Sequence, residues 1–427
     1  MLVTSYLGSI RVGCSESVKL AGVINLSPES FYKGSVAKSS DEALAIARKM
    51  IEGGADILDI GGMSTAPYKI TQVSEEVELH RVLEAVKIIK KETNVVISID
   101  TFRSKVADAA LSAGADVIND VTGLHGDSNM ARVVADHSAS VILMAKEDFI
   151  PASIKGSYKP LQVIKRILKE SLNKALDAGV SSDQIVIDPG IGFFRRQNIP
   201  WYEWDLLVIM SLSRLFSLGY PIAVGASRKS FIGELTGVKE AEHRLYGSLA
   251  AEAIAVSQGA DVIRTHNPGE SLQAIRVAEG ARSVYVNSGG GKCLPYAREE
   301  DSEVHLLPHF EDADDAKELL ELVQSDDKAI ASLSNKSVHK NVLLLNVPMP
   351  LLLIIKQEML SLGGDVATPK EAILGRHERG NALLMGNLSQ LKRLCSRLEK
   401  MEILYLKNKG LLTPSRLSEL IRKMLER

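Results

Sequence analysis

The chain has 427 residues, of which 45% are hydrophobic and 24% charged, an ordinary composition for a globular protein with one large and one smaller domain. Its 51 Lys and Arg residues nearly balance its 53 Asp and Glu residues, and the net charge of −2 gives no support to a nucleic-acid-binding protein. The cysteines, Cys14, Cys293 and Cys395, lie far apart, so neither a zinc site nor a disulfide framework is expected, and a reducing cytoplasm is favoured.

No stretch of the chain has the pattern of a signal peptide or a membrane span. Residues 1–13 lack a basic start followed by an apolar core. The longest apolar stretch, residues 342–355, is too short to cross a bilayer and contains two prolines. We therefore expect a soluble cytoplasmic protein that does not bind membranes.

Short runs rich in β-branched residues alternate with longer amphipathic runs over the first two thirds of the chain. The apolar runs predict eight strands, at residues 19–26, 55–62, 95–100, 115–120, 140–145, 184–190, 221–226 and 260–266. The segments between them have helical periodicity, and Ser39 with Glu42 has the spacing of a helix-capping box. Several predicted helices end in Gly just before the next strand, as helix C-caps do.

Eight β/α units in roughly 270 residues predict a (β/α)8 TIM barrel, whose usual length is about 250 residues. The strands are apolar almost throughout, as expected of parallel strands buried on both faces. A doubly wound open sheet is the alternative, but it usually has fewer units, and no GxGxxG follows the first strand. The fold class is therefore α/β, with a barrel as the main domain.

The pattern changes near residue 285, and this change predicts the domain boundaries. Residues 1–285 are expected to form the barrel, and residues 286–337, rich in Gly and acidic residues, a polar linker. Residues 338–427 have the pattern of a small α/β or α+β domain, with elements expected at 341–347, 351–364, 381–387, 388–401 and 414–427. This second domain contains no catalytic constellation, and the sequence assigns it no role.

Polar residues gather where the predicted barrel strands end, and in a barrel those ends meet at one mouth. In chain order they are Asn25, Asp59, Asp100, Asn119, Asp120, Asp188, Arg228, Lys229, Arg264 and His266. Strands three, four and six supply carboxylates and a carboxamide, which suit a ligand edge rich in N–H donors. Strands seven, eight and one supply cationic, imidazole and amide side chains, which suit an anion such as a phosphate. The pair Arg228 and Lys229 is expected to face the anionic end of a substrate.

Six stretches together resemble dihydropteroate synthases and their pterin-binding relatives. They follow the family's order over about three-fifths of the chain and read GVINLSPESF, GADILDIGGMSTAP, ISIDTFRSKVADAALSAGADVINDVTG, VIDPGIGF, GASRKSFIG and GSLAAEAIAVSQGADVIRTHNPGES. The resemblance implies a transferase that joins 6-hydroxymethyl-dihydropterin diphosphate to an arylamine and releases pyrophosphate, in folate or methanopterin biosynthesis. It implies Mg²⁺ as the cofactor and is compatible with a homodimer.

The resemblance also implies roles at the pterin end of the site. Asp188 and Asn119 would bind the amino-pyrimidine edge of the pterin, and Asp100 would lie beside the ring and stabilise positive charge as the diphosphate leaves. Lys229 would contact the pterin carbonyl and a ring nitrogen. The expected catalytic residues are Asp100, Lys229 and Arg264, which would act by electrostatic stabilisation.

Other residues would bind the diphosphate and the arylamine. Arg264 would pack on the ring face and hold the diphosphate together with His266. Asn25 would bind both the diphosphate and Mg²⁺. Thr65 and Ser230 would lie on the arylamine side.

The second motif departs from the family pattern. It lacks the Glu and Arg that the family usually has, because Met63 and Ala66 occupy their places. Elsewhere, Ala145 after strand five replaces a His, and Asn267 after strand eight replaces an Asp. Some archaeal relatives with such departures are associated with methanopterin synthesis, and this chain resembles them. Its C-terminal segment resembles one that is attached to some archaeal and clostridial members of the family. Because the missing arginine removes a bidentate anion partner, we expect p-aminobenzoate to be a poor substrate and a bulkier or phosphorylated arylamine to be a better one.

Two other functions stay open at this point. A methyltransferase that uses a methyl-pterin and a corrinoid protein shares the barrel and the pterin carboxylates. It would not need the Ser-Arg-Lys loop after strand seven or the Asn-x-Ser-Pro loop after strand one, and both are present. A non-catalytic pterin-binding protein is the third possibility, suggested by Met63 and Ala66.

Overall fold

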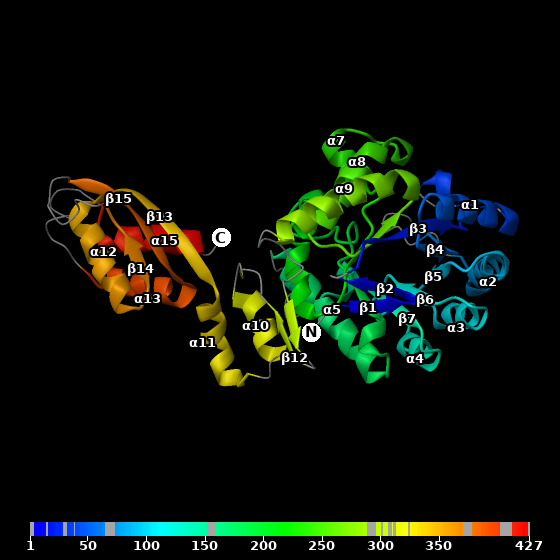
Figure 1. The fold of residues 1–427 in the computed structure, drawn as a ribbon, viewed down its shortest axis with the longest axis horizontal. Coiled ribbons are helices and arrows are strands. Elements are labelled where there is room, and N and C mark those ends of the chain that lie inside the picture. The colour runs from blue at the N-terminus through cyan, green and yellow to red at the C-terminus, as the bar shows by residue number, and fades with distance from the viewer. Residues whose placement is uncertain are drawn as a thin grey trace. The chain divides into compact units, whose positions relative to one another are not determined.

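The structure is a computed structural model. It describes residues 4–13, 16–28, 32–37, 39–64, 73–151, 159–287, 296–299, 302–305, 310, 313–322, 325–369, 378–401 and 412–425. The chain divides into two compact units, Met1–Leu306 and Leu307–Arg427 (Figure 1). Each unit has a hydrophobic core of its own.

Eight parallel strands form the wall of the first unit. They lie in the order β8 (Ile185–Asp188), β7 (Ser140–Met144), β6 (Val117–Asp120), β5 (Val96–Asp100), β4 (Ile57–Gly61), β3 (Lys19–Asn25), β10 (Val262–Thr265) and β9 (Ala223–Val224). A parallel bridge between Ile187 and Ile222 joins the two ends of the series. The predicted TIM barrel is confirmed, because every strand lies beside its neighbours in the sequence.

Helices cover the outside of the barrel (Figure 1). They are α1 (Ser40–Glu52), α2 (Glu75–Glu92), α3 (Ser104–Ser112), α4 (Met130–Asp136), α5 (Pro160–Asp177), α6 (Trp201–Met210), α7 (Ser230–Thr236), α8 (Leu245–Ser257) and α9 (Pro268–Asn287). Short 3-10 helices lie in the connections: η1 (Lys33–Ser35), η2 (Glu147–Phe149), η4 (Ser182–Gln184), η5 (Leu212–Leu218) and η6 (Ala241–His243). Ser39 caps α1 as predicted, since its side chain accepts a hydrogen bond from the backbone N–H of Glu42 at 3.2 Å.

An antiparallel hairpin, β1 (Thr4–Leu7) with β2 (Ile10–Gly13), precedes the barrel and was not predicted from the sequence. Its Leu7 and Val12 are fully buried against residues at the amino-terminal ends of the barrel strands, among them Ala21, Ile57 and Val96. The hairpin therefore closes the amino-terminal end of the barrel, and a ligand reaches the interior from the opposite end.

The second unit has a three-stranded antiparallel sheet in the order β13 (His339–Pro348), β15 (Arg379–Asn387) and β14 (Asp365–Ala367). It contains the helices α10 (Ala313–Leu322), α11 (Asp327–Ser337), α12 (Met349–Ser361), α13 (Leu388–Glu399) and α15 (Pro414–Leu425). The strands and helices predicted after residue 338 are present, and β14 is an addition to them. The expected linker, residues 286–337, includes α10, α11 and a hairpin of β11 (Tyr296–Glu299) with β12 (Ser302–His305). No helix in the described ranges is both long and apolar enough to cross a membrane.

Candidate active site

The register of the barrel strands brings predicted site residues to one level of the mouth. Successive strands pair four residues in a row, Asn25, Gly61, Asp100 and Asn119. Asp188 ends β8 in register with Met144 on β7. Because paired residues of parallel strands lie side by side, the side chains of Asn25, Asp100 and Asn119 start from the same level. Asp188 lies two residues farther along its strand, since Asn119 pairs with Ile142 and Ile142 pairs with Val186.

Asp59, in β4, is the buried centre of this mouth. Arg264 Nε donates a hydrogen bond to Asp59 Oδ2 at 2.9 Å, and Arg264 Nη2 contacts the same oxygen. Ser98 Oγ donates to Asp59 Oδ1 at 2.7 Å, and Asn119 Nδ2 donates to Asp59 Oδ2 at 3.2 Å. A buried charge needs such partners, so Asp59 fixes both Arg264 and Asn119. The sequence placed Asp59 on its strand but gave it no role in the site.

Asp100 and Asn119 each keep one buried acceptor oxygen. Asp100 Oδ2 accepts a hydrogen bond from Arg264 Nη2 at 3.1 Å, and the amide nitrogen of Asn119 donates a hydrogen bond to Asp59. Asp100 Oδ1 and Asn119 Oδ1 are buried and have no hydrogen-bond partner within the described ranges. Leaving a buried acceptor unsatisfied costs about 1–3 kcal/mol, and native proteins rarely do so without a reason. The mouth therefore offers two fixed acceptors to a ligand that carries N–H donors.

Two carboxyl groups of the mouth, Asp100 and Asp188, have raised pKa values. Burial raises the pKa of Asp100 to about 7, while Arg264 opposes the rise and the charge of Asp59 adds to it. Burial also raises the pKa of Asp188, against the opposing effects of Arg264 and of the Gly190 N–H, which donates to Asp188 Oδ1 at 2.8 Å. Asp100 thus titrates near neutral pH, so a change in the charges around it will change its protonation.

Lys229 follows β9 and lies near these carboxyl groups. Its Nζ is 4.5 Å from the centroid of the Phe193 ring, a cation–π contact. Burial and then the charge of Arg264 lower its pKa to about 8, although Asp188 and Asp205 act in the opposite direction. Lys229 is therefore a cation at neutral pH, positioned to bind an electron-rich atom of a ligand.

Arg228 binds other parts of the protein, contrary to the prediction that it and Lys229 together face an anion. Its guanidinium donates to Asn267 Oδ1 at 2.5 Å and to the carbonyl oxygens of residues 241–242 at 3.1 and 2.6 Å. It also lies 4.7 Å from the centroid of the Tyr32 ring. The backbone of Arg228 has φ of +61°, so its side chain does not follow the alternation expected at a strand end. Arg228 joins loops, and Lys229 alone of the pair is left for a ligand.

The connection after β3 lies beside the end of β10. Asn25 Nδ2 donates to Ser35 Oγ at 2.7 Å, and the ring of Tyr32 meets the His266 ring edge-on, with centroids 5.0 Å apart. His266 Nδ1 lies 3.1 Å from Ser227 Oγ. Burial and the nearby cations lower the pKa of His266 to about 3, so the ring is neutral and offers a hydrogen bond rather than a charge.

The structure describes only some of the residues expected on the arylamine side of the site. Thr65 and Ala66 lie in residues 65–72, outside the described residues, and Met63 is buried. Ser230 begins α7, and its Oγ accepts a hydrogen bond from Arg195 Nη2 at 2.5 Å. Sequence reasoning missed Arg195, because an arginine in the loop after one strand gives no sign that it reaches the end of a different strand.

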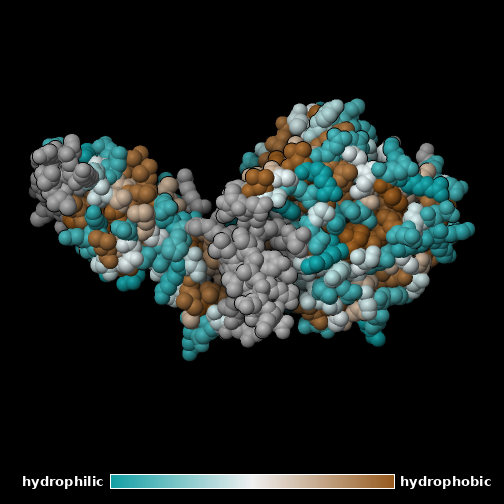
Figure 2. Space-filling model, in the orientation of Figure 1, coloured by the Kyte–Doolittle hydropathy of each residue, from teal (hydrophilic) through white to brown (hydrophobic). Residues whose placement is uncertain are grey.

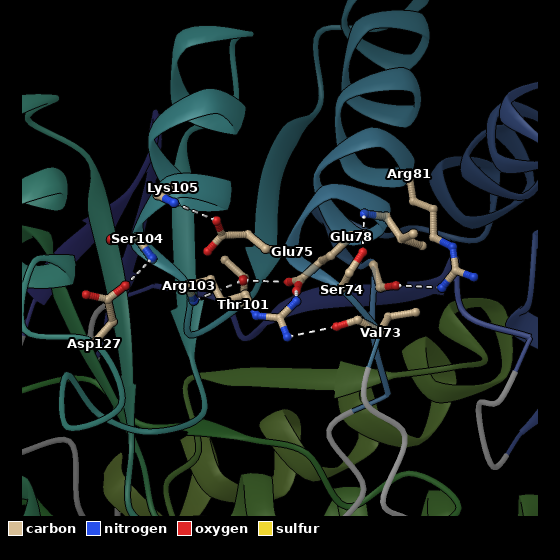
Figure 3. Close-up of polar contacts among 12 residues, drawn as sticks. Val73, Ser74, Glu75, Glu78, Arg81, Thr101, Arg103, Ser104, Lys105 and Asp127 are labelled. Carbon is tan, nitrogen blue, oxygen red and sulfur yellow. Dashed lines mark hydrogen bonds and ion pairs between the residues drawn. The ribbon is translucent and has the colours of Figure 1, made fainter.

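An ion pair between Glu78 and Arg103 joins α2 to the residues that follow β5 (Figure 3). Glu78, on α2, is fully buried and accepts hydrogen bonds from Thr101 Oγ1 and Arg103 Nη1, both at 2.6 Å. Arg103 Nη2 also donates to the carbonyl oxygen of Val73 at 2.9 Å. These contacts tie the residues that follow β5 to the start of α2. They therefore fix the backbone on which Asp100 is carried.

A second arginine, Arg81 on α2, binds the first residues of the connection between β4 and α2. Arg81 Nη1 donates to the carbonyl oxygen of Gly62 at 3.1 Å, just after β4 (Figure 3). The connection between β4 and α2 is thus bound at Gly62 and at Val73. The sequence alone gave no sign that Glu78 has a buried partner.

We expect Glu78→Gln to lower the free energy of unfolding by about 3 kcal/mol, because it leaves the Arg103 charge without its buried counter-charge. Urea denaturation followed by circular dichroism measures the change. Lys105→Gln is the matched control, since Lys105 pairs with Glu75 at the exposed start of α2 and its loss should leave stability unchanged. Equal stability of the two variants would contradict a structural role for Glu78.

Comparison with known proteins gives one consistent result. Residues 21–266 match the family of pterin-binding enzymes. The chain is similar to the dihydropteroate synthase of Clostridium beijerinckii, with 38% identity over 276 residues that cover 64% of this chain and 97% of the relative. It is also similar to the dihydropteroate synthase of Bacillus subtilis, with 35% identity over 64% of this chain and 91% of the relative.

Solved structures give the same result. A dihydropteroate synthase of Coxiella burnetii in complex with pteroic acid is 36% identical, with a TM-score of 0.59, over 66% of this chain and 100% of that chain. The dihydropteroate synthase of Xanthomonas albilineans with 4-aminobenzoic acid is 32% identical, also with a TM-score of 0.59, over 66% of this chain and 99% of that chain.

Proposed function

This chain belongs to the pterin-binding enzyme family, and we propose that it is a dihydropteroate synthase, a transferase that joins 6-hydroxymethyl-dihydropterin diphosphate to an arylamine with release of pyrophosphate. The observation that carries the proposal is the pair of unsatisfied acceptor oxygens on Asp100 and Asn119. The amino-pyrimidine edge of a pterin presents N–H donors, which carboxylate and carboxamide oxygens accept. Asp188 in the same mouth adds a third acceptor group.

The reaction needs charged side chains that stabilise the transition state, and it needs no nucleophile from the protein. The C–O bond between the pterin methylene carbon and the diphosphate breaks, and its electron pair leaves with the diphosphate. Asp100, when ionised, stabilises the positive charge that develops on the pterin, and Arg264 and Lys229 supply positive charge for the pterin carbonyl and the leaving group. The arylamine nitrogen then forms the new C–N bond and loses a proton.

We propose Mg²⁺ as the cofactor, with Asn25 as a ligand. No group of three or more His, Cys, Asp or Glu side chains in the described ranges can hold a metal ion. A single carboxamide oxygen from Asn25 still fits Mg²⁺, because this ion keeps several waters and commonly binds few protein oxygens together with substrate phosphates. The Asn25 amide nitrogen donates to Ser35 Oγ, and this contact supports the carboxamide oxygen as the proposed ligand atom. When bound, Mg²⁺ would neutralise charge on the leaving diphosphate.

We further propose that the part of the chain beyond residue 306 is an extension of the barrel, of the kind attached to some archaeal and clostridial members of the family. A cytoplasmic location and a homodimer are also proposed. The support for the dimer is a set of exposed apolar side chains on α8 and α9, namely Tyr246, Ile254, Val277 and Val284. Figure 2 shows hydrophobic residues on the surface in this part of the first unit. Exposed apolar patches commonly mark interfaces.

The test of the proposed function is an incubation of the full chain with the pterin diphosphate, Mg²⁺ and p-aminobenzoate. Release of pyrophosphate with formation of a pterin–arylamine product is the expected result. Binding of the pterin without turnover with any arylamine would instead indicate a pterin-binding protein. Transfer of a methyl group from a methyl-pterin to a corrinoid protein would indicate the methyltransferase.

We expect a bell-shaped pH profile of kcat/KM for the pterin diphosphate. Asp100 must be ionised, and because its pKa is raised to about 7, activity is lost as the pH falls through that value. Lys229 must be protonated, and because its pKa is lowered to about 8, activity is lost as the pH rises through that value. Initial rates between about pH 5 and pH 10 measure both limbs. A profile that stays flat around neutral pH would contradict these assignments.

A further inference from the structure

Glu252, on α8, is a buried carboxylate that the proposed reaction does not use, and it ends a chain of hydrogen bonds. Ser271 Oγ, on α9, donates to Glu252 Oε2 at 2.6 Å. Thr265 Oγ1, at the end of β10, lies 2.8 Å from Ser271 Oγ, and the backbone N–H of Asn267 donates to Thr265 Oγ1 at 3.2 Å. The side chains of Glu252, Ser271 and Thr265 are all fully buried.

The ionised carboxylate gives this chain of hydrogen bonds one direction. A carboxylate only accepts hydrogen bonds, so the Ser271 hydroxyl directs its proton at Glu252. Ser271 Oγ then accepts from the Thr265 hydroxyl, and Thr265 Oγ1 accepts from the Asn267 N–H. The turn of residues 265–267 is therefore fixed to α8, and His266 is the middle residue of that turn.

Arg228 is a buried cation in contact with neutral groups. It is 3% exposed, and the contacts that the structure describes for its guanidinium are with the Asn267 amide oxygen, two carbonyl oxygens and the Tyr32 ring. Asn267 stands where the family usually has an Asp, so this chain lacks a carboxylate at that contact. A buried cation needs a counter-charge, and the Asn267 amide does not supply one.

The charge of Glu252 acts on Arg228. Burial raises the pKa of Glu252 to about 7, and the hydroxyls of Ser271 and Thr265 and the charge of Arg228 oppose the rise. Above that pH, Glu252 carries a negative charge that the Arg228 cation stabilises. Glu252 Oε1 is buried and has no hydrogen-bond partner in the described part of the chain, an arrangement that native proteins rarely keep without a reason.

The backbone of Arg228 is held separately from its side chain. Its N–H donates to the side chain of Ser248, one turn before Glu252 on α8, at 2.9 Å. Its carbonyl oxygen accepts a hydrogen bond from Arg244 Nη1 at 3.1 Å. Lys229, the next residue, therefore keeps its position without Glu252. A loss of the Glu252 charge acts instead on the Arg228 guanidinium, on Asn267 and on the turn that contains His266.

We propose that Glu252 is a positioning residue for the diphosphate end of the site: its carboxylate is the counter-charge of Arg228 and fixes the turn that carries His266. The proposal rests on the proposed function and on the role in diphosphate binding that the family resemblance implies for His266. Glu252 itself contacts no ligand in this proposal, because it acts through Ser271, Thr265 and Asn267.

The test is calorimetry with Glu252→Gln, which keeps the shape of the side chain and removes its charge. At about pH 8, where Glu252 is ionised in the unmodified chain, we expect the affinity for the pterin diphosphate with Mg²⁺ to fall about 10-fold. The affinity for 6-hydroxymethyl-dihydropterin, which lacks the diphosphate, should stay within about twofold, since Lys229 and the acceptors of the mouth keep their positions. Glu270→Gln is the matched control, because Glu270 is exposed and directly precedes Ser271, and it should change neither affinity. An equal loss for both ligands, or no loss, overturns the proposal.

Asn267→Asp tests the charge itself, because it places a carboxylate at the contact with Arg228. In the Glu252→Gln background it should restore the diphosphate affinity and raise the Tm by about 2–4 °C, and in the unmodified chain, where Glu252 already supplies the charge, it should raise the Tm less. Equal Tm shifts in the two backgrounds overturn the proposal. If Glu252→Gln does not fold, cooperative unfolding of the double variant supports the proposal, and its failure to fold overturns it. If the unmodified chain binds no pterin and releases no pyrophosphate, the proposed function fails, and the Tm shifts still decide the pairing of Glu252 with Arg228.

Discussion

Asp188→Asn is expected to weaken pterin binding by about 2–4 kcal/mol, because it replaces a buried charged acceptor by a neutral group that presents a single oxygen. Asp188 is 2% exposed at the end of β8, and one of its oxygens already accepts the Gly190 N–H. The amide of the variant would keep that backbone contact only by turning its NH2 group toward the donors of the pterin. Calorimetry with 6-hydroxymethyl-dihydropterin measures the loss.

Asp183→Asn is the matched control for this experiment. Asp183 lies five residues earlier on η4, and it is exposed and bonded to Ser181. The same chemical change at that position should leave pterin affinity unaltered. Unchanged affinity in Asp188→Asn as well would remove Asp188 from the pterin site and leave Asp100 and Asn119 to account for recognition of the ring edge.

The barrel could be predicted because each strand is short, apolar and followed by a helix with clear periodicity. The same alternation places Asn25, Asp100, Asn119 and Asp188 at strand ends, and parallel register then brings the first three to one level. These placements need only local information. The roles that the family resemblance implies for those residues stay predictions.

Contacts between distant parts of the chain could not be predicted in the same way. The ion pair of Asp59 with Arg264 joins residues 205 positions apart. Arg228 lies next to Lys229, yet its left-handed backbone turns it toward Asn267 and Tyr32. A sequence lists such residues as candidates, but only the three-dimensional arrangement shows which charges meet each other and which remain for a ligand.

The hairpin at the amino-terminal end of the barrel was missed for a related reason. Its strands have four residues each, too few for a periodic pattern to be recognised. Their burial comes from contacts that Leu7 and Val12 make with several barrel strands at once. The strands of the second unit, by contrast, were predicted because β13 and β15 are long and have apolar centres rich in Leu.

Arg264→Gln is expected to lower kcat/KM by about 10²- to 10³-fold, because the proposed mechanism uses this fixed cation to stabilise the charge of the leaving group. It also leaves Asp59 buried without its counter-charge. Thermal unfolding of the variant separates lost catalysis from lost folding, since a variant that still melts cooperatively retains the barrel.

The direction in which the acidic limb of the pH profile moves gives the sharper test. Arg264 lowers the pKa of Asp100 and Asp59 raises it. Arg264→Gln should therefore move the acidic limb above about pH 7, whereas Asp59→Asn should move it below that value. Asp59→Asn also frees Arg264 to pair with Asp100, which strengthens the downward shift. Limbs that stay in place, or that move in the same direction in both variants, would show that Asp100 is not the group whose ionisation the reaction requires.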